Sequence, residues 1–245
     1  MPAILLEGID LQRGSTPVFQ ALTLHLHESR IGLIGHNGAG KTSLLRLLCG
    51  LEDPAQGRVC IDGQDIHREA RGLRRSQLIG MMFQNPDDQI IFPTVEEELA
   101  LSLQPRGLGK REALAQARTF LQQRGLEAWA RRAVTSLSQG QRQHVCWLAL
   151  LLAGPATLLL DEPYASLDLP GQARLARDLA QCPQQLIVST HLLDHVRHYP
   201  RVLWMDQGRI HLDGDGPTVC AAYEQAVARQ LAADDATARA AAERR

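Results

Sequence analysis

A glycine-rich segment that ends in a lysine and a threonine has the residue types and spacing to bind phosphate. It fits the pattern G-x-x-x-x-G-K-S/T and, with the serine that follows, consists of Gly35, His36, Asn37, Gly38, Ala39, Gly40, Lys41, Thr42 and Ser43. Its glycines let consecutive backbone N–H groups converge on phosphate oxygens at the N-terminus of a helix. Lys41 would add positive charge beside the β- and γ-phosphates, and Thr42 would offer a hydroxyl ligand to Mg²⁺.

Two adjacent carboxylates form a second candidate site. Asp161 and Glu162 follow the apolar run Leu158-Leu159-Leu160, which is typical of a buried strand. Asp161 would hold Mg²⁺ directly or through its waters, and Glu162 would orient and partly deprotonate an attacking water. Alone, such a pair is more often a solvated turn, but a phosphate loop upstream favours nucleotide hydrolysis.

The elements that must position these residues alternate between strand and helix. Short apolar strands are predicted at 33–34, 158–160 and 186–189, and helices at 44–48 and 172–179. A strand before the phosphate loop and a helix after it are the context that favours this loop over an ordinary glycine turn. The pattern predicts an α/β domain.

The middle and the end of the chain differ from this alternation. Strand-like sequence is absent from about 94 to 136, where Glu96 opens a helical stretch and 111–124 reads as an amphipathic helix closed by Gly125. We therefore expect a helical insert. Val219, Tyr223, Val227 and Leu231 recur at helical spacing near the end, which predicts a short docked helix and then a frayed tail.

Composition excludes several classes of protein. Hydrophobic residues make up 44% and charged residues 22%, as in globular proteins, and the formal net charge is -1, so a basic surface for nucleic acid is not supported. The longest uncharged stretch, 144–160, is interrupted by Gly154-Pro155, and we expect no membrane span. The five cysteines contain no CxxC and indicate reduced thiols.

Further motifs appear in an order that resembles the ATP-binding cassette (ABC) ATPases. Gln84 follows Met81-Met82-Phe83 as the glutamine loop of that family does, and 137–141 is similar to its signature sequence. The segment 160–163 resembles its Walker B motif, 165–168 its D-loop, and His191 its switch histidine. Any one motif is weak, but the ordered set is specific and the resemblance spans roughly residues 4–216.

The resemblance implies a cofactor set and a mechanism. ATP and Mg²⁺ would bind between two cassettes that close head to tail, so that the phosphate loop of one faces the signature of the other. Gln84 would sense Mg²⁺ or the water, and His191 would hydrogen-bond the γ-phosphate. The residues that would act from the other copy are Ser138, Gly140, Gln141 and, as a link between the two sites, Asp168.

Two positions depart from the family pattern. Gln139 stands at the third signature position, where glycine is usual, but Ser138 and Gly140 are retained. Near the start of the chain the family often has an aromatic residue that stacks on adenine, and Arg13 takes that place here. A planar guanidinium can stack on a base; the alternative is a solvated arginine.

The segment after Gln84 is similar to that of energy-coupling factor (ECF) importer ATPases. In that group this segment receives an arginine-bearing helix of a transmembrane coupling subunit, and Asp87 and Asp88 have the charge to bind it. The alternative is a solvated acidic loop. The segment 90–93 is most similar to biotin importers, with cobalt or nickel importers close behind. A substrate-binding membrane subunit would be an indirect partner.

Three alternatives remain beside this interpretation. Histidines at 191, 195 and 198 could share a helix face and bind a metal, although no cysteine or carboxylate pattern completes a chelate. A soluble ABC ATPase acting on DNA or ribosomes is disfavoured because the chain has one cassette, no long heptad run and no basic tract. A non-hydrolysing sensor is disfavoured by the presence of Glu162 and His191.

The expected organisation follows from these patterns and the resemblance. We predict an α/β phosphate-loop core with a mostly parallel sheet and an antiparallel β subdomain, in a single ATPase domain at 1–216. A helical subdomain at about 88–153 would be inserted in it, and residues 217–245 would form the C-terminal helix and frayed tail. The protein would be a peripheral, Mg²⁺-dependent ATPase on the cytoplasmic face of the inner membrane.

Overall fold

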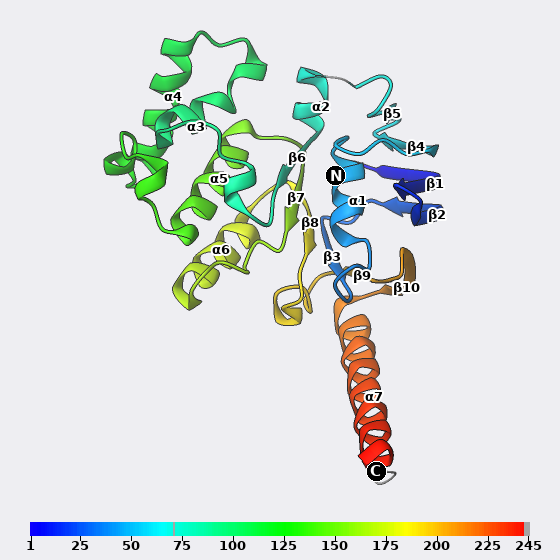
Figure 1. Cartoon of the computed structure of the whole chain (residues 1–245). Helices are drawn as coiled ribbons and strands as arrows, with labels where there is room; N and C mark the ends of the chain where they lie inside the picture. The colour runs from blue at the N-terminus through cyan, green and yellow to red at the C-terminus, as the bar shows by residue number, and fades with distance from the viewer. Residues whose placement is uncertain (71, 243–245) are drawn as a thin grey trace.

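The computed structural model describes residues 1–70 and 72–242 (Figure 1). The strands within this range are β1 (Ile4–Arg13), β2 (Thr16–Leu26), β3 (Arg30–Ile34), β4 (Gln56–Ile61), β5 (Gln64–Asp65), β6 (Ile79–Met82), β7 (Thr157–Asp161), β8 (Gln185–Ser189), β9 (Arg201–Asp206) and β10 (Arg209–Gly214). The α-helices are α1 (Lys41–Leu48), α2 (Leu73–Leu78), α3 (Val95–Leu101), α4 (Lys110–Gln123), α5 (Gln139–Ala153), α6 (Leu169–Gln181) and α7 (Gly216–Ala242).

Most of the larger sheet is parallel. Among the described residues its strand order is β10-β9-β3-β8-β7-β6, and only the edge strand β10 runs antiparallel to its neighbour. Because β3, β7 and β8 are parallel neighbours, their carboxyl ends meet at one edge of the sheet. The phosphate loop follows β3, Asp161 ends β7, and His191 lies just beyond β8, so the topology brings the predicted chemistry to a single edge.

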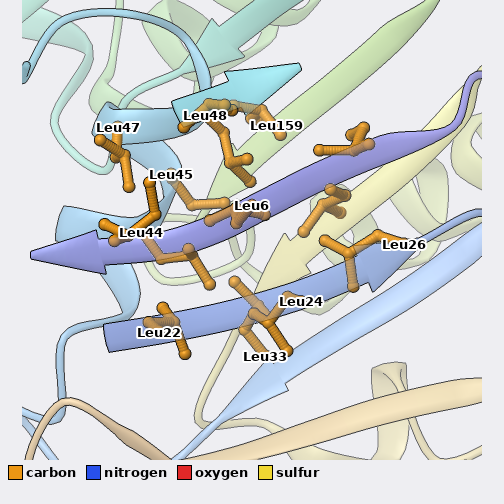
Figure 2. Close-up of a cluster of buried hydrophobic side chains, with 14 of the residues drawn as sticks. Leu6, Leu22, Leu24, Leu26, Leu33, Leu44, Leu45, Leu47, Leu48 and Leu159 are labelled. Carbon is orange, nitrogen blue, oxygen red and sulfur yellow. The ribbon is translucent and has the colours of Figure 1, made fainter. Parts of the chain in front are cut away.

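An antiparallel sheet lies on the other side of α1. Its strand order is β2-β1-β4-β5 within the described range, and Figure 1 shows it in blue and cyan beside α1. Figure 2 shows leucines of α1 against leucines of β1, β2, β3 and β7, all from one buried cluster; the labelled side chains are Leu6, Leu22, Leu24, Leu26, Leu33, Leu44, Leu45, Leu47, Leu48 and Leu159. Each buried leucine contributes about 1.5–3 kcal/mol, so the helix after the phosphate loop is fixed from two sides.

The chain between β6 and β7 is helical, as its sequence pattern predicts. It contains α3, α4 and α5, which pack through their own apolar cluster around Val95, Leu121 and Val145. Figure 1 shows this lobe at the end of the molecule away from the antiparallel sheet. The α/β fold class, with a mostly parallel sheet, an antiparallel β sheet and helices between β6 and β7, is confirmed.

The C-terminal helix is longer than the sequence pattern predicts. The pattern predicts a short docked helix, whereas α7 continues to Ala242 and extends away from the body of the molecule (Figure 1). Its first turns are docked through the buried side chains of Val219 and Cys220. Alanine has the highest helix propensity, and the alanine-rich sequence after Val227 explains why the helix continues. Residues 243–245 of the predicted tail lie outside the described residues.

None of the helices formed by residues 1–70 and 72–242 combines the length and the apolar character that crossing a bilayer requires.

Candidate active site

The phosphate loop connects β3 to α1 through backbone conformations that favour glycine. Gly35 has a φ of 138°, and a Cβ atom there would lie 2.1 Å from the carbonyl oxygen of Met205. Gly40 has a φ of 103°, and its Cβ would lie 2.9 Å from the ring of Phe19. Neither position accepts another side chain without a shift of its neighbours. The two glycines therefore fix the path that leads the loop into the first turn of α1.

Lys41 is the first residue of α1 and lies inside the loop. It is 8% exposed, and its Nζ donates hydrogen bonds to the carbonyl oxygens of Gly35, at 2.6 Å, and of His36, at 3.1 Å. Burial lowers the pKa of Lys41, while the nearby carboxylates of Glu162 and Asp161 act in the opposite direction. The ammonium group is thus held between the loop and the two predicted acidic residues.

Thr42 and Asp161 meet across the end of the sheet. The hydroxyl of Thr42 donates a hydrogen bond to Oδ2 of Asp161 at 2.8 Å. Asp161 is 2% exposed, and its Oδ1 is a buried acceptor with no hydrogen-bond partner among the described residues. A buried acceptor without a partner is unfavourable, and a cation beside the hydroxyl would remove that cost.

This pair fits the way proteins hold Mg²⁺ beside a nucleotide. Such sites use one or two carboxylates together with substrate phosphates, and leave the rest of the coordination shell to water. Within residues 1–70 and 72–242 no group of three or more His, Cys, Asp or Glu side chains could hold a metal on its own. A site that needs the phosphates of its substrate agrees with both observations.

Glu162 is held by His191. The Oε2 atom of Glu162 lies 2.7 Å from Nδ1 of His191 and also accepts a hydrogen bond from the His191 backbone N–H at 3.3 Å. The backbone N–H of Glu162 donates to the carbonyl oxygen of Ser189 at 2.9 Å. Glu162 itself has a φ of 48°, in the left-handed region that non-glycine residues rarely adopt. The carboxylate is therefore fixed to the loop after β8.

A cavity of about 800 Å³ connects these residues. Two other predicted residues, Gln84 and Arg13, also line it, and Arg13 binds the carboxylate of Glu52 at 2.6 Å. The predicted stacking of Arg13 on adenine stays a prediction. The members of the cavity wall that the sequence singled out are Arg13, Asn37, Gly38, Ala39, Gly40, Lys41, Thr42, Ser43, Gln84, Asp161, Glu162 and His191.

The signature residues lie elsewhere, around a second cavity of about 560 Å³. Ser138 caps α5: its hydroxyl accepts from the backbone N–H of Gln141 at 3.2 Å, and the Gln141 side chain accepts from the Ser138 N–H at 3.0 Å. Asp168 caps α6 by accepting from the backbone N–H of Gly171 at 2.9 Å. Gly140 also lines this cavity. One chain does not bring these residues to its own phosphate loop.

The three histidines considered for a metal do not share a helix face. Residues Leu193–His195 form a single 3-10 turn, and the ring of His195 stacks on Tyr164 with 3.6 Å between ring centroids. His198 packs edge-on against Tyr199, while His191 bonds Glu162.

Two contacts of the site region were not predicted. Arg142 pairs with Asp87, the residue predicted to receive an arginine from another subunit. The ring of Tyr223 on α7 lies 5.5 Å from that of His36 in the phosphate loop. Both contacts join residues far apart in the chain. Opposite charge or aromatic character was the only signal that a single sequence offered for them.

The fold, the Thr42–Asp161 pair and the Glu162–His191 pair beside the phosphate loop define a phosphate-loop nucleoside triphosphatase. Residues 19–165 match the family model of the ABC transporter. The chain belongs to the ABC transporter family, and it is an ATP-binding, ATP-hydrolysing enzyme subunit coupled to transport.

Individual relatives give the same result. The chain is 41% identical to the biotin transport ATP-binding protein BioM of Rhodobacter capsulatus, over 94% of this chain and 98% of that protein. It is 36% identical to the energy-coupling factor transporter ATP-binding protein EcfA1 of Levilactobacillus brevis, over 78% of this chain and 69% of the relative. The solved structure of CbiO1 from Clostridium perfringens, part of the ABC transporter complex CbiONQ, superposes with a TM-score of 0.75 at 25% identity, over 93% of both chains.

Proposed function

We propose that the chain is the ATPase of an ECF-type importer and that biotin is the solute it helps to import. The names of its relatives support this proposal: BioM proteins of Rhodobacter capsulatus and Rhizobium etli are 41% and 37% identical to it, and EcfA1 is 36% identical. The observation that carries the mechanism is the division of predicted site residues between two cavities. A complete site then requires a second copy, either of this chain or of a paralogue.

The phosphates of ATP would bind in the loop between β3 and α1. Lys41 would exchange its hydrogen bonds with the carbonyl oxygens of Gly35 and His36 for contacts with the β- and γ-phosphates. The hydroxyl of Thr42 and the buried Oδ1 of Asp161 would hold Mg²⁺. When bound there, Mg²⁺ would neutralise charge that develops on the phosphates.

Glu162 would orient and partly deprotonate the attacking water. Its bond to His191 fixes the carboxylate, and the side chain of His191 is 60% exposed, so that the second ring nitrogen can reach a phosphate oxygen. Gln84 would report the state of this cavity to the segment that follows it. A general base accelerates the reaction only when it is aligned with the water that it deprotonates, so holding Glu162 in place contributes to the rate.

The second copy would supply Ser138, Gly140, Gln141 and Asp168. The N-terminus of α5, whose capping residue is Ser138, carries backbone N–H groups and a favourable dipole for the γ-phosphate of the facing copy. ATP would hold the two copies together, and hydrolysis would remove the bridging phosphate. Dimer opening would then change the conformation of the membrane subunits that are bound to the two copies.

The proposed partners and location follow from the same assignment. A transmembrane coupling subunit would dock near Asp87 and Asp88, the substrate-binding membrane subunit would act indirectly, and the chain would lie at the cytoplasmic face of the membrane. We keep the predicted organisation as part of the proposal: one ATPase domain at 1–216, a helical subdomain at about 88–153 and an appended segment at 217–245.

The deciding experiment is purification of the tagged full chain from detergent-solubilised membranes, with its companions identified by mass. We expect one membrane coupling subunit and one small substrate-binding subunit to co-purify. In a separate assay, cells that carry the parent chain should take up labelled biotin, and cells that carry Lys41→Ala should not. Uptake of labelled cobalt but not of biotin would show that the imported solute is a metal ion. Recovery of the chain without any membrane protein would contradict the importer assignment.

A further inference from the structure

Arg142 connects the acidic turn after Gln84 to the signature segment. It lies in the first turn of α5, and its Nη1 donates a hydrogen bond to the carbonyl oxygen of Leu137 at 2.7 Å. Leu137 immediately precedes Ser138, the capping residue that is proposed to face the nucleotide of the other copy. The guanidinium therefore holds the backbone at the point where the signature segment enters its helix.

The same guanidinium faces Asp87. Nε of Arg142 lies 2.8 Å from Oδ1 of Asp87, although its N–H is not aligned for a hydrogen bond, so the contact is an ion pair. Asp87 belongs to the 3-10 turn Pro86–Asp88, whose start is fixed because Asn85 accepts a hydrogen bond from the Asp87 backbone N–H. This turn begins two residues after Gln84, which lines the catalytic cavity.

The two ends of the pair differ in their exposure. The side chain of Asp87 is 60% exposed, whereas that of Arg142 is 21% exposed. A carboxylate has two oxygens and can accept from two guanidinium groups at once. Asp87 can therefore bind a cation from outside the chain with one oxygen while the other stays beside Arg142.

We propose that Asp87 and Arg142 form a positioning pair through which a docked membrane subunit acts on the signature segment. A cationic side chain of that subunit would bind the exposed oxygen of Asp87 and restrict the position of that carboxylate. Asp87 in turn positions the guanidinium of Arg142, and Arg142 holds the carbonyl of Leu137. This inference rests on the proposed function for the identity of the cation. The internal half, from Asp87 to Leu137, belongs to this chain alone and can be measured without a partner.

The first measurement uses the isolated full chain in an E162Q background, in which ATP-driven dimers should accumulate because hydrolysis is slowed. Dimer formation is followed by sedimentation against the concentration of magnesium ATP for R142Q, D87N and the double variant. We expect each single variant to raise the half-maximal ATP concentration by about three- to tenfold, as for the loss of one partly exposed charged contact. The double variant should be no worse than either single one.

That non-additivity separates a working pair from a general loss of stability. The matched control is R111Q, which removes an exposed arginine of α4 and should behave as the parent. R142K keeps the charge but cannot contact Leu137 and Asp87 with the same fork, and should be intermediate. Two results would overturn the proposed coupling from Asp87 through Arg142 to Leu137. One is a double variant whose half-maximal ATP concentration rises by the product of the two single effects. The other is an R142Q variant that dimerises at the same ATP concentration as R111Q.

The second measurement uses the complex with its membrane partners. R142Q should still co-purify with them, because Asp87 remains, yet partner-dependent stimulation of ATP hydrolysis should be lost; D87N should lose both. Stimulation retained in R142Q would overturn the proposed transmission while leaving the importer assignment intact. Failure of the parent chain to bind any membrane protein would instead remove the importer assignment, and the dimerisation result would still stand.

Discussion

The catalytic edge of the parallel sheet and the signature region at the start of α5 differ in how complete they are within one chain. At the catalytic edge, Lys41 contacts the loop carbonyls, Thr42 contacts Asp161, and Glu162 contacts His191, all inside one cavity. In the signature region, Ser138 and Asp168 satisfy their own helix ends and line another cavity.

The difference shows which steps one copy can perform alone. Phosphate binding needs only the catalytic edge, whereas a closed site also needs the N-terminus of α5 from elsewhere. Substitutions at the two regions should therefore separate nucleotide binding from dimerisation.

Lys41→Ala should have the broadest effect, because ATP binding precedes both dimerisation and hydrolysis. Removing a buried ammonium group that faces the phosphates should weaken ATP binding by about a hundredfold or more, because several charge-assisted contacts are lost together. Isothermal titration of the isolated chain measures this. Lys110→Ala, at an exposed position of α4, is the matched control and should bind as the parent does. Unchanged affinity in Lys41→Ala would break the assignment of the catalytic edge.

Glu162→Gln should separate hydrolysis from binding. Loss of a general base slows the chemical step by about 10²–10⁴-fold, while ATP affinity and ATP-driven dimerisation should remain. Phosphate release and sedimentation measure the two properties on the same sample. Glu112→Gln, at an exposed position of α4, controls for the lost charge. Hydrolysis at the parent rate would show that another group activates the water.

The catalytic edge could be predicted from sequence because its signals are local. Residues Gly35 to Thr42 are consecutive, so the motif itself shows that they lie together. An apolar strand directly before Asp161 places that carboxylate at the end of a buried strand. The parallel pairing of β3 with β8 and of β8 with β7 then brings the residues that follow these strands to the same edge of the sheet. The α/β class follows from the same alternation of strands and helices, whereas the antiparallel β subdomain and the role of His191 follow from the resemblance to ABC ATPases.

Contacts between distant segments could not be predicted. Asp87 has the charge to receive an arginine, but nothing in one sequence shows that Arg142 of the same chain lies beside it. The length of α7 was underestimated because the apolar spacing that predicts docking ends at Leu231, whereas helix propensity continues through the alanines that follow. Packing and propensity are separate causes of helix formation, and only the first leaves a periodic pattern.

Ser138→Ala should affect the signature region alone. Loss of the cap costs about 1 kcal/mol at the start of α5. Because only a formed first turn presents its N–H groups to the facing copy, fraying of that turn should raise the ATP concentration needed for dimerisation in the Glu162→Gln background by at most about fivefold. Nucleotide binding by the monomer should not change, in contrast with Lys41→Ala. Ser138→Thr retains a capping hydroxyl and should restore most of the dimerisation. A weaker monomer affinity in Ser138→Ala would mean that the two regions are not separate.

Tyr223→Ala should have the smallest effect and would show whether α7 supports the catalytic edge. The Tyr223 ring lies between His36 of the phosphate loop and Trp204 of β9, at centroid distances of 5.5 and 5.2 Å. Aromatic pairs contribute about 0.5–1.5 kcal/mol, and a tilted contact of 5.5 Å between ring centroids should lie at the low end of that range, so the KM for ATP should rise about twofold while kcat is retained. Tyr223→Phe keeps the ring and should match the parent. Because His36 also presents its carbonyl to Lys41, a change confined to KM would place the start of α7 among the elements that hold the loop, whereas an unchanged KM would limit α7 to packing on β9 and β10.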